Sequence, residues 1–466
     1  MMGQLPAAQN SLFYEFSLEQ HVPQGHLLRQ IDRFLDFDSI RQHLSPYYSH
    51  TGRPSIDPEL MIRMLLLGYC YGIRSERRLC EEVHFNLAYR WFCRLGLEEA
   101  VPDHSTFSKN RHGRFRESDL LRYVFNTVVN RCFEEGLVGG DGFAIDASLV
   151  RADASKERRE DGPVDWTPSK TQTRAVKEYL EYLDQDESLN RKQKCVSLTD
   201  PMSQWSAAPG SADFYYSTNY LVDLSCNIIM DVEATPSHRQ LEVATTRTMI
   251  ERVEDLHEIR PRRLLGDTAY GSADNLDYLV SEMEIEPHIP VWDKTQRKTE
   301  TFSVGDFEWD GTADQYRCPG KKVLRRRERN YKHLESDVTK ANTVIYRSRV
   351  ADCRSCELKA KCCPNTTFRK ISRSIYEDSR EVARSITSSQ EYLETSFHER
   401  KKVEMQFAHM KHHLHLDRLR LRGLSGAGDE FLLVATAQNL RRMAKLLSRP
   451  PPGGRVSAPK IQKSAQ

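Results

Sequence analysis

The feature that most constrains the fold of this chain is an alternation of short apolar segments and longer helical ones between residues 136 and 292. The segment GFAIDASLV at 142–150 alternates apolar and other residues with the period of two that is typical of a β-strand. The rest of the pattern predicts strands at 220–224 and 227–234, a helix at 241–256, a strand at 263–265, a helix from Ser272 and a strand at 286–292. This order predicts a mixed α/β sheet with helices packed on it.

Two aspartates stand at informative places in this pattern. Asp146 lies in the middle of the otherwise apolar first strand, where a carboxylate is costly to bury unless it is paired or binds a metal. Asp267 follows the strand at 263–265 and precedes a loop that contains glycine, a common place for active-site chemistry in α/β folds. The structural alternatives are a strand residue that faces water for Asp146 and a helix N-cap or loop residue for Asp267.

The stretch FHERKKVEMQFAHMK at 397–411 predicts one helix with two stripes. The apolar stripe, which is expected to pack on the rest of the protein, consists of Val403, Phe407, Met410 and Leu414. The neighbouring stripe consists of Phe397, Arg400, Glu404 and Lys411. The alternative for this second stripe is a solvated face with an Arg400–Glu404 salt bridge, which contributes about 0.2–0.5 kcal/mol.

The N-terminal region, residues 1–135, predicts several short helices. Asp57 and Pro58 suit the start of an apolar helix, Ser75 suits the start of a basic one, and a further helix begins at Asp103 or Ser105. Short helices with tight turns resemble a helix-turn-helix module. The predicted phosphate contacts are Arg74, Arg77, Arg78, Lys109 and Arg111. The alternative is a plain helical bundle with solvated basic faces.

Five of the eleven cysteines fall in a segment at 293–395 that reads as loop-rich and poor in apolar residues. Four of them could share one metal: Cys318, Cys353, Cys356 and Cys362, and Cys363 could replace the last of these. Cysteines with a C-x2-C pair favour a tetrahedral metal, most simply Zn²⁺, with an iron–sulfur cluster as the second choice and free thiols as the structural alternative.

Basic residues cluster at two further places. One run lies in the same segment and includes Lys321, Lys322, Arg325, Arg326, Arg327 and Arg329. The other follows the helix at 397–411 and includes Arg418, Arg420 and Arg422. Both predict contacts with DNA phosphates, and solvated loops are the alternative. The net charge of +2, from 68 basic and 66 acidic side chains, does not reveal these clusters.

The bulk properties restrict the class of protein. A hydrophobic fraction of 39% is too high for a disordered chain, and no apolar run reaches the length of about 18 residues that a membrane span needs. The N-terminus lacks the basic start and apolar core of a signal peptide. We therefore expect no membrane contact and a reducing, cytoplasmic environment for the cysteines.

Three of these elements resemble the DDE transposases of bacterial insertion sequences. The two aspartates stand in AIDASLVRADAS and LLGDTAYGS, and the predicted helix matches the signature Tyr-x2-Arg-x3-Glu-x6-Lys as Phe397, Arg400, Glu404 and Lys411. The segments GRPSIDPELMIRMLLLGYCYGIRSERRLCEEV and PDHSTFSKNR also resemble the N-terminal domain of such transposases, so the resemblance covers residues 15–445. Phe397 departs from the signature because phenylalanine lacks the tyrosine hydroxyl.

The resemblance implies a catalytic triad of Asp146, Asp267 and Glu404 that holds two Mg²⁺ or Mn²⁺ ions. It implies hydrolysis that frees a 3′-OH at the ends of an element, followed by attack of that 3′-OH on target DNA. Arg400 and Lys411 would hold phosphates. The implied partners are double-stranded DNA and a second copy of the chain, at the bacterial nucleoid. The alternatives are a metal-dependent nuclease without strand transfer and an inactive, zinc-containing DNA-binding protein.

The expected fold is an α/β, ribonuclease-H-like mixed sheet with flanking helices, preceded by an all-α, helix-turn-helix-like region and interrupted by a cysteine-containing insertion. The expected segments are a DNA-binding region at 1–135, the catalytic domain at 136–292 and 396–447, the insertion at 293–395 and a disordered tail at 448–466.

Overall fold

The computed structural model describes residues 16–49, 51, 55–162, 164–166, 173–185, 195–207, 210, 212–293, 301–326 and 338–448. Arg327, Arg329 and residues 449–466 of the expected tail lie outside these residues. Contacts divide the chain into two compact units: residues 1–139, 147–238 and 404–466 form the first, and residues 140–146 and 239–403 form the second. The segment boundaries expected from the sequence remain predictions.

The N-terminal part of the first unit is helical, as predicted. Its elements are α1 (Leu18–His21), α2 (Leu27–Asp32), α3 (Phe37–Leu44), η1 (Ser45–Tyr47), α4 (Pro58–Cys70), α5 (Glu76–Phe85), α6 (Leu87–Phe92), α7 (Ser105–His112), α8 (Arg114–Glu117) and α9 (Leu120–Glu134). The predicted caps are confirmed, because the Asp57 carboxylate accepts the N–H of Glu59 at 2.8 Å and the Ser75 hydroxyl accepts the N–H of Arg78 at 3.4 Å.

The first unit also contains antiparallel strands. Strands β4 (Gln204–Ser206) and β6 (Ile228–Pro236) both pair with β5 (Asp213–Asp223). Strand β2 (Arg159–Asp161) pairs with β3 (Cys195–Ser197), and α10 (Arg174–Gln185) lies between these two in the sequence. The predicted hairpin is thus confirmed, although its first strand begins at 213 and not at 220.

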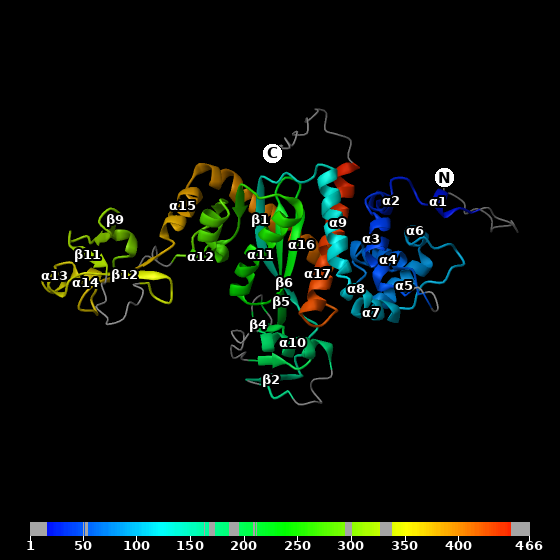
Figure 1. Cartoon of the computed structure of the whole chain (residues 1–466), viewed down its shortest axis with the longest axis horizontal. Helices are drawn as coiled ribbons and strands as arrows, with labels where there is room; N and C mark the ends of the chain where they lie inside the picture. The colour runs from blue at the N-terminus through cyan, green and yellow to red at the C-terminus, as the bar shows by residue number, and fades with distance from the viewer. Residues whose placement is uncertain are drawn as a thin grey trace, which may run out of the picture. The chain divides into compact units, whose positions relative to one another are not determined.

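Helix α17 (Leu424–Leu447) supports this unit and packs against β6, α9 and α4 (Figure 1). Its buried Asn439 side chain bonds to both backbone groups of Ile229 on β6. The Asn439 oxygen accepts the Ile229 N–H at 2.9 Å, and the Asn439 amide donates to the Ile229 carbonyl at 2.8 Å. The side chain therefore satisfies backbone groups that the pairing of β6 with β5 leaves open.

The second unit contains the parallel strands. The first half of β1 (Gly142–Arg151) pairs in parallel with β7 (Arg263–Leu265), and β7 pairs in parallel with β8 (Glu286–His288). The elements between them are α11 (Arg239–His257), η3 (Thr268–Tyr270), α12 (Ala273–Asp277) and the π-turn η4 (Tyr278–Glu282). Antiparallel and parallel strands with helices between them confirm the mixed α/β prediction.

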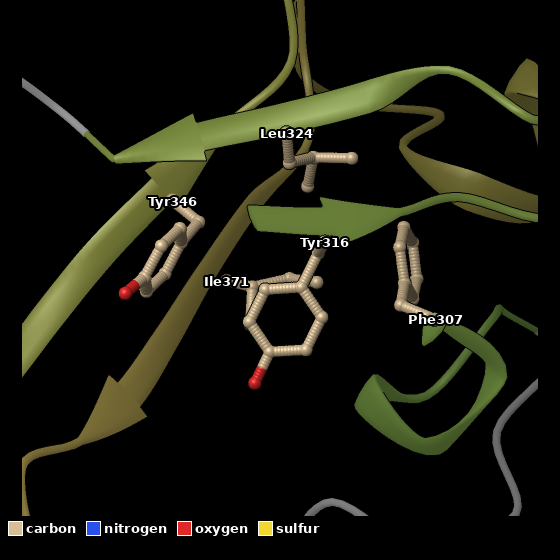
Figure 2. Packing of buried hydrophobic residues seen from close by; sticks show 5 residues of the cluster. All are labelled: Phe307, Tyr316, Leu324, Tyr346 and Ile371. Carbon is tan, nitrogen blue, oxygen red and sulfur yellow. The ribbon is translucent and has the colours of Figure 1, made fainter. Parts of the chain in front are cut away.

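The insertion is a folded module and not the loop-rich segment that the sequence indicated. Its antiparallel sheet has the order β13–β12–β11–β10–β9, formed by β9 (Glu308–Asp310), β10 (Gln315–Arg317), β11 (Val323–Arg326), β12 (Thr343–Arg347) and β13 (Lys370–Ser374). Figure 2 shows its core of Phe307, Tyr316, Leu324, Tyr346 and Ile371. Strands of three to five residues are too short for a clear period, which is why the sequence concealed them.

Short elements complete the second unit. They are η5 (Val304–Asp306), α13 (Val350–Arg354), α14 (Lys359–Cys362), α15 (Glu377–Thr387) and the π-turn η6 (Tyr392–Ser396). Helix α16 (Phe397–His413) follows and contributes residues to both units. Across the described ranges, no helix is long and apolar enough to cross a membrane.

Candidate active site and nucleic-acid surfaces

Strands β1 and β7 place Asp146 and Asp267 at the same level of neighbouring parallel strands. Three residue pairs are in register with an offset of 121 residues (263 − 142): Gly142–Arg263, Phe143–Leu264 and Ala144–Leu265. Asp146 and Asp267 have the same offset (267 − 146) and lie two residues beyond the last pair. The two segments are still close to each other at the residue before each aspartate, because a Cβ atom on Gly266 would lie 3.3 Å from Cγ2 of Ile145. Strands of a sheet are about 4.8 Å apart, so the backbone segments that carry Asp146 and Asp267 are close to each other.

The two aspartates have different surroundings. Asp267 is exposed and caps η3, because its Oδ1 accepts the N–H of Ala269 at 2.7 Å. The N-cap alternative is thus realised, but a carboxylate has a second oxygen that can serve another partner. Asp146 is half-buried on β1.

A third acidic residue shares this location and was missed in the sequence. Burial raises the pKa of Tyr270 well above its usual range, and the negative charges of Asp146, Glu242 and Asp267 raise it further. Glu242 lies in the first turn of α11, which packs against η3. The only sequence signal was an acid at the start of a helix, and such acids usually interact with the helix dipole.

Helix α16 has the apolar face that its sequence predicts. Val403, Phe407 and Met410 are buried, and the Phe407 ring lies 5.3 Å from that of Tyr220 on β5, measured between centroids. Glu404 is exposed, as a residue of the neighbouring stripe should be.

The other residues of the signature occupy distinct environments. Phe397 is 38% exposed, with the Lys401 ammonium 4.6 Å and the Arg400 guanidinium carbon 5.8 Å from its ring centroid. Its ring therefore lies within the range of cation–π contact with both side chains. Lys411 is half-buried, and burial lowers the pKa of its ammonium group.

The structure brings together two members of the predicted triad. Asp146 and Asp267 belong to the second unit, whereas Glu404 belongs to the first. Among the residues that the structure describes, no three or more His, Cys, Asp or Glu side chains form a group that could hold a metal ion. The role of Glu404 as the third carboxylate therefore remains a prediction.

The first unit contains a basic groove, which we define as two adjoining pockets of about 520 and 450 Å³. Residues of both the N-terminal helices and the 415–422 segment line it. Its cations are Arg74, Arg78, Arg151, Lys156, Arg418, Arg420 and Arg422. Segment 417–419 runs beside the end of β1, with the Leu419 N–H donating to the Arg151 carbonyl at 2.7 Å.

The basic residues of this segment lie at the surface. Arg418, Arg420 and Arg422 are exposed, whereas Leu416 and Leu419 are buried. The DNA contacts predicted for the three arginines stay a prediction.

A buried ion pair fixes the wall of the groove. Arg74 pairs with Glu430, and both side chains are almost completely buried. Arg74 also donates to the His415 carbonyl at 2.8 Å. Gly72 takes a φ of 69°, and a Cβ atom there would lie 2.8 Å from Nδ1 of His415, so only glycine suits this position. Arg74 is thus held by partners within the protein, and the phosphate contact predicted for it stays a prediction.

The other N-terminal cations that were predicted to contact phosphates differ in their exposure. Arg111 is 4% exposed and pairs with Glu76 at 2.6 Å, so in this structure the protein itself neutralises it. Arg77, Arg78 and Lys109 are exposed and remain candidates. A sequence does not reveal which cation meets a buried carboxylate.

The insertion has a second basic surface, which we call the insertion pocket. It has a volume of about 600 Å³ and is lined by the cations Lys321, Lys322, Arg325, Arg326, Arg347 and Arg349. Of the described residues that line it, Asp352 is the acidic one, and Phe368 adds an aromatic ring.

Like charges face one another across the strands of this pocket. Arg325 on β11 is the register partner of Arg347 on β12, and Arg347 is the partner of Lys370 on β13. Cross-strand cations directly opposite each other destabilise a sheet. A bound anion would remove that repulsion.

The chain matches two family models, a transposase domain over residues 16–113 and a transposase DDE domain over residues 317–444. Both models describe transposase domains and the second describes a DDE domain, so the matches support a DDE transposase. The second match contains Phe397, Arg400, Glu404 and Lys411, but neither match covers residues 114–316. The nearness of both Asp146 and Asp267 to Tyr270 is therefore observed independently of these matches. A DDE transposase domain implies an enzyme that cleaves and moves DNA and depends on divalent metal ions.

A solved structure also matches. It is the cryo-EM structure of the piggyBac transposase synaptic complex with hairpin DNA, which is 11% identical over 91% of this chain and 80% of that chain, with a TM-score of 0.30. A likeness at that score carries no argument about the fold.

Proposed function

We propose that this DDE transposase binds the inverted-repeat ends of an insertion sequence, cleaves DNA to free a 3′-OH and transfers that end to target DNA. The observation that supports the proposal is that Asp146 and Asp267 each lie two residues beyond the last register pair of the parallel strands β1 and β7. The proposed fold of this part is ribonuclease-H-like.

The carboxylates suit a hard divalent cation. Mg²⁺ binds through one or two carboxylates and keeps other positions for water and substrate phosphate, and Mn²⁺ accepts the same oxygen donors. When two such ions are bound, they stabilise the charge that develops on the attacked phosphodiester. Asp146 would contact both ions, while Asp267 and Glu404 would each hold mainly one.

The cations would hold the DNA. Arg400 and Lys411 lie on the same helix as Glu404 and would bind phosphates near the reacting bond. The basic groove and the insertion pocket would bind the duplex further away. Two ends must be joined in one reaction, so the proposed working form is a homodimer on DNA at the nucleoid.

A strand-transfer assay with labelled end DNA and Mg²⁺ tests the proposal. Product formation should fall by more than about 100-fold in each of Asp146→Asn, Asp267→Asn and Glu404→Gln. A residue that only orients a metal ligand costs at most about 100-fold when it is lost, so a larger fall indicates a direct ligand. Asp274→Asn, which changes an exposed acid in the first turn of α12, is the matched control and should retain activity.

The products separate the alternatives. Cleaved but unjoined DNA would identify a nuclease without strand transfer. Binding without cleavage would identify an inactive DNA-binding protein. Equal joining by wild type and Asp146→Asn would overturn the assigned site.

A further inference from the structure

The five-stranded sheet of the insertion has two different faces. On one face, strands β11, β12 and β13 contribute the core residues Leu324, Tyr346 and Ile371 (Figure 2). Successive residues of a strand point to opposite faces. Arg325, Arg347 and Lys370 are each next in sequence to one of these core residues, so they lie on the other face, and all three are exposed. The sheet therefore separates an apolar face from a basic one.

The three cations form a row across the sheet. Arg325 on β11 is in register with Arg347 on β12, and Arg347 is in register with Lys370 on β13. Neighbouring strands are about 4.8 Å apart, so the row extends over about 10 Å. Cations this close together suit the phosphates of a nucleic-acid backbone.

An aromatic ring stands beside this row. Phe368 lines the insertion pocket, is half-exposed, and has the Lys370 ammonium 5.4 Å from its ring centroid. A phenyl ring has no hydrogen-bond donor for a phosphate, but it can stack on a nucleobase. The pocket therefore offers two kinds of contact, one for a backbone and one for a base.

The backbone on both sides of Phe368 is fixed. The Thr366 hydroxyl donates to the Phe368 carbonyl at 3.0 Å. The Ser348 N–H donates to the Arg369 carbonyl at 3.2 Å, and the Arg369 N–H donates to the Ser348 hydroxyl at 3.1 Å. The Arg369 guanidinium turns to the core, where its carbon lies 5.2 Å from the Phe307 ring centroid. The ring of Phe368 is therefore preorganised, which lowers the entropic cost of binding.

This fixation does not use the zinc site that the sequence predicts for the cysteines of the insertion. The described residues contain no group of His, Cys, Asp or Glu side chains that could hold a metal ion, so that site stays a prediction.

The phosphates of a duplex would account for the cations of the pocket but not for its aromatic ring. In a duplex, the neighbouring bases cover both faces of each base, so no face is open to Phe368. In a single strand these faces are accessible. Proteins that bind single strands combine a basic track for the backbone with aromatic rings for the bases.

We propose that the insertion pocket binds single-stranded DNA that adjoins the bound duplex. Arg325, Arg347 and Lys370 hold its phosphates, and Phe368 stacks on one of its bases. The choice of DNA as the nucleic acid rests on the proposed function, whereas the preference for an unpaired strand rests on this face of the sheet.

Fluorescence anisotropy with the full-length protein and two DNAs, in a buffer with EDTA that prevents cleavage, tests the proposal. One DNA is a blunt duplex, and the other is the same duplex with a single-stranded extension of about ten thymidines, a length that such surfaces accommodate. Phe368→Leu should weaken binding of the extended DNA by about 5-fold or more, the effect of losing one stacked base. Its affinity for the blunt duplex should equal that of wild type.

Two further variants control for the change of side chain. Phe85→Leu alters an exposed phenylalanine of the first unit and should bind both DNAs as wild type does. Phe368→Tyr keeps an aromatic ring and should retain the affinity for the extended DNA. Equal losses on both DNAs in Phe368→Leu, or no loss on either, would overturn the proposal. Tighter binding of an RNA extension than of the DNA extension would overturn the choice of DNA.

Photochemical cross-linking of wild type locates the base without relying on a variant. When 5-iodouracil in the extension is irradiated, it cross-links to an aromatic ring that stacks on it. Mass spectrometry should find the cross-link in the peptide that contains Phe368. The absence of a cross-link at Phe368 would contradict the stacking.

The preference for extended DNA and strand transfer are independent measurements. A protein that joins DNA ends but shows no preference that depends on Phe368 would disprove the ligand of the pocket alone. A protein that shows this preference but joins no ends would disprove strand transfer alone.

Discussion

The basic groove and the insertion pocket both gather arginines, but they hold them differently. In the groove, Asp153 pairs with Arg418 at 3.3 Å and with Arg422 at 2.9 Å. In the pocket, Arg325 and Arg347 face each other across two strands. The groove is therefore held in shape by its own acids, whereas the pocket contains repulsion that a polyanion would relieve. A count of cations alone would have treated the two surfaces as equivalent.

The largest effect is expected at the buried anchor of the groove. Arg74→Met leaves the buried Glu430 without its ionic partner, although the N–H groups of Arg420 and Leu421 still donate to it, and the loss of one partner of a buried ion pair costs about 3–5 kcal/mol. Urea unfolding of the first unit should show it as a lower midpoint. Arg78→Met, at an exposed residue of the same groove, is the control and should change stability by less than about 0.5 kcal/mol. Equal urea midpoints for the two variants would mean that the buried Arg74–Glu430 pair does not stabilise the groove.

Charge reversal in the pocket should have the next largest effect. Arg325→Glu/Arg347→Glu should weaken duplex binding by about 100-fold, since each charge-assisted hydrogen bond contributes about 1.5 kcal/mol or more. The slope of log affinity against log salt should become shallower by about two. Arg418→Gln/Arg422→Gln should cost less, because Asp153 already partly neutralises both side chains. A larger loss of duplex affinity in the groove variant than in the pocket variant would show that the groove contributes more to DNA binding.

A buried carboxyl behind the groove predicts pH dependence. Burial raises the pKa of Asp200 to about 7, although the Tyr216 hydroxyl donates to its carboxyl group at 2.5 Å. The folded state thus binds this proton more tightly than the unfolded state, whose pKa is about 3.9. Stability should fall as pH rises from about 4 to 7, by at most about 1.4 kcal/mol per pH unit.

Asp200→Asn is the test of this pH dependence. Urea midpoints at several pH values should show a flatter profile for this variant than for wild type. Parallel profiles would assign the pH dependence to other groups.

The smallest predicted effect is a gain in stability. Arg347→Met removes a cation that faces both Arg325 and Lys370, so the insertion should become more stable by about 0.2–1 kcal/mol while DNA binding weakens. Thermal unfolding and anisotropy on the same sample would measure both. Destabilisation would show that the facing cations are already compensated.

The sequence predicted those features that depend on local pattern. The strand at 263–265, the cap of α4 at Asp57 and the apolar face of α16 are all found. Each depends on residues a few positions apart, where helix and strand periods act directly.

Features that depend on distant partners were missed. Arg74 meets Glu430 and Arg111 meets Glu76, and neither pairing is visible in a charge pattern. Glu242 joins the two aspartates only because α11 packs on η3. The sheet of the insertion was missed because its strands are short and its core is mostly aromatic.

The Asn439 side chain has a consequence for the behaviour of the protein in solution. A strand edge with open amide and carbonyl groups can recruit a strand from another molecule and so begin aggregation. Asn439 occupies both groups of Ile229 and comes from α17 of the same chain, so it blocks such recruitment at this position on β6. A polar residue in the interior of α17 thereby contributes to solubility as well as to packing.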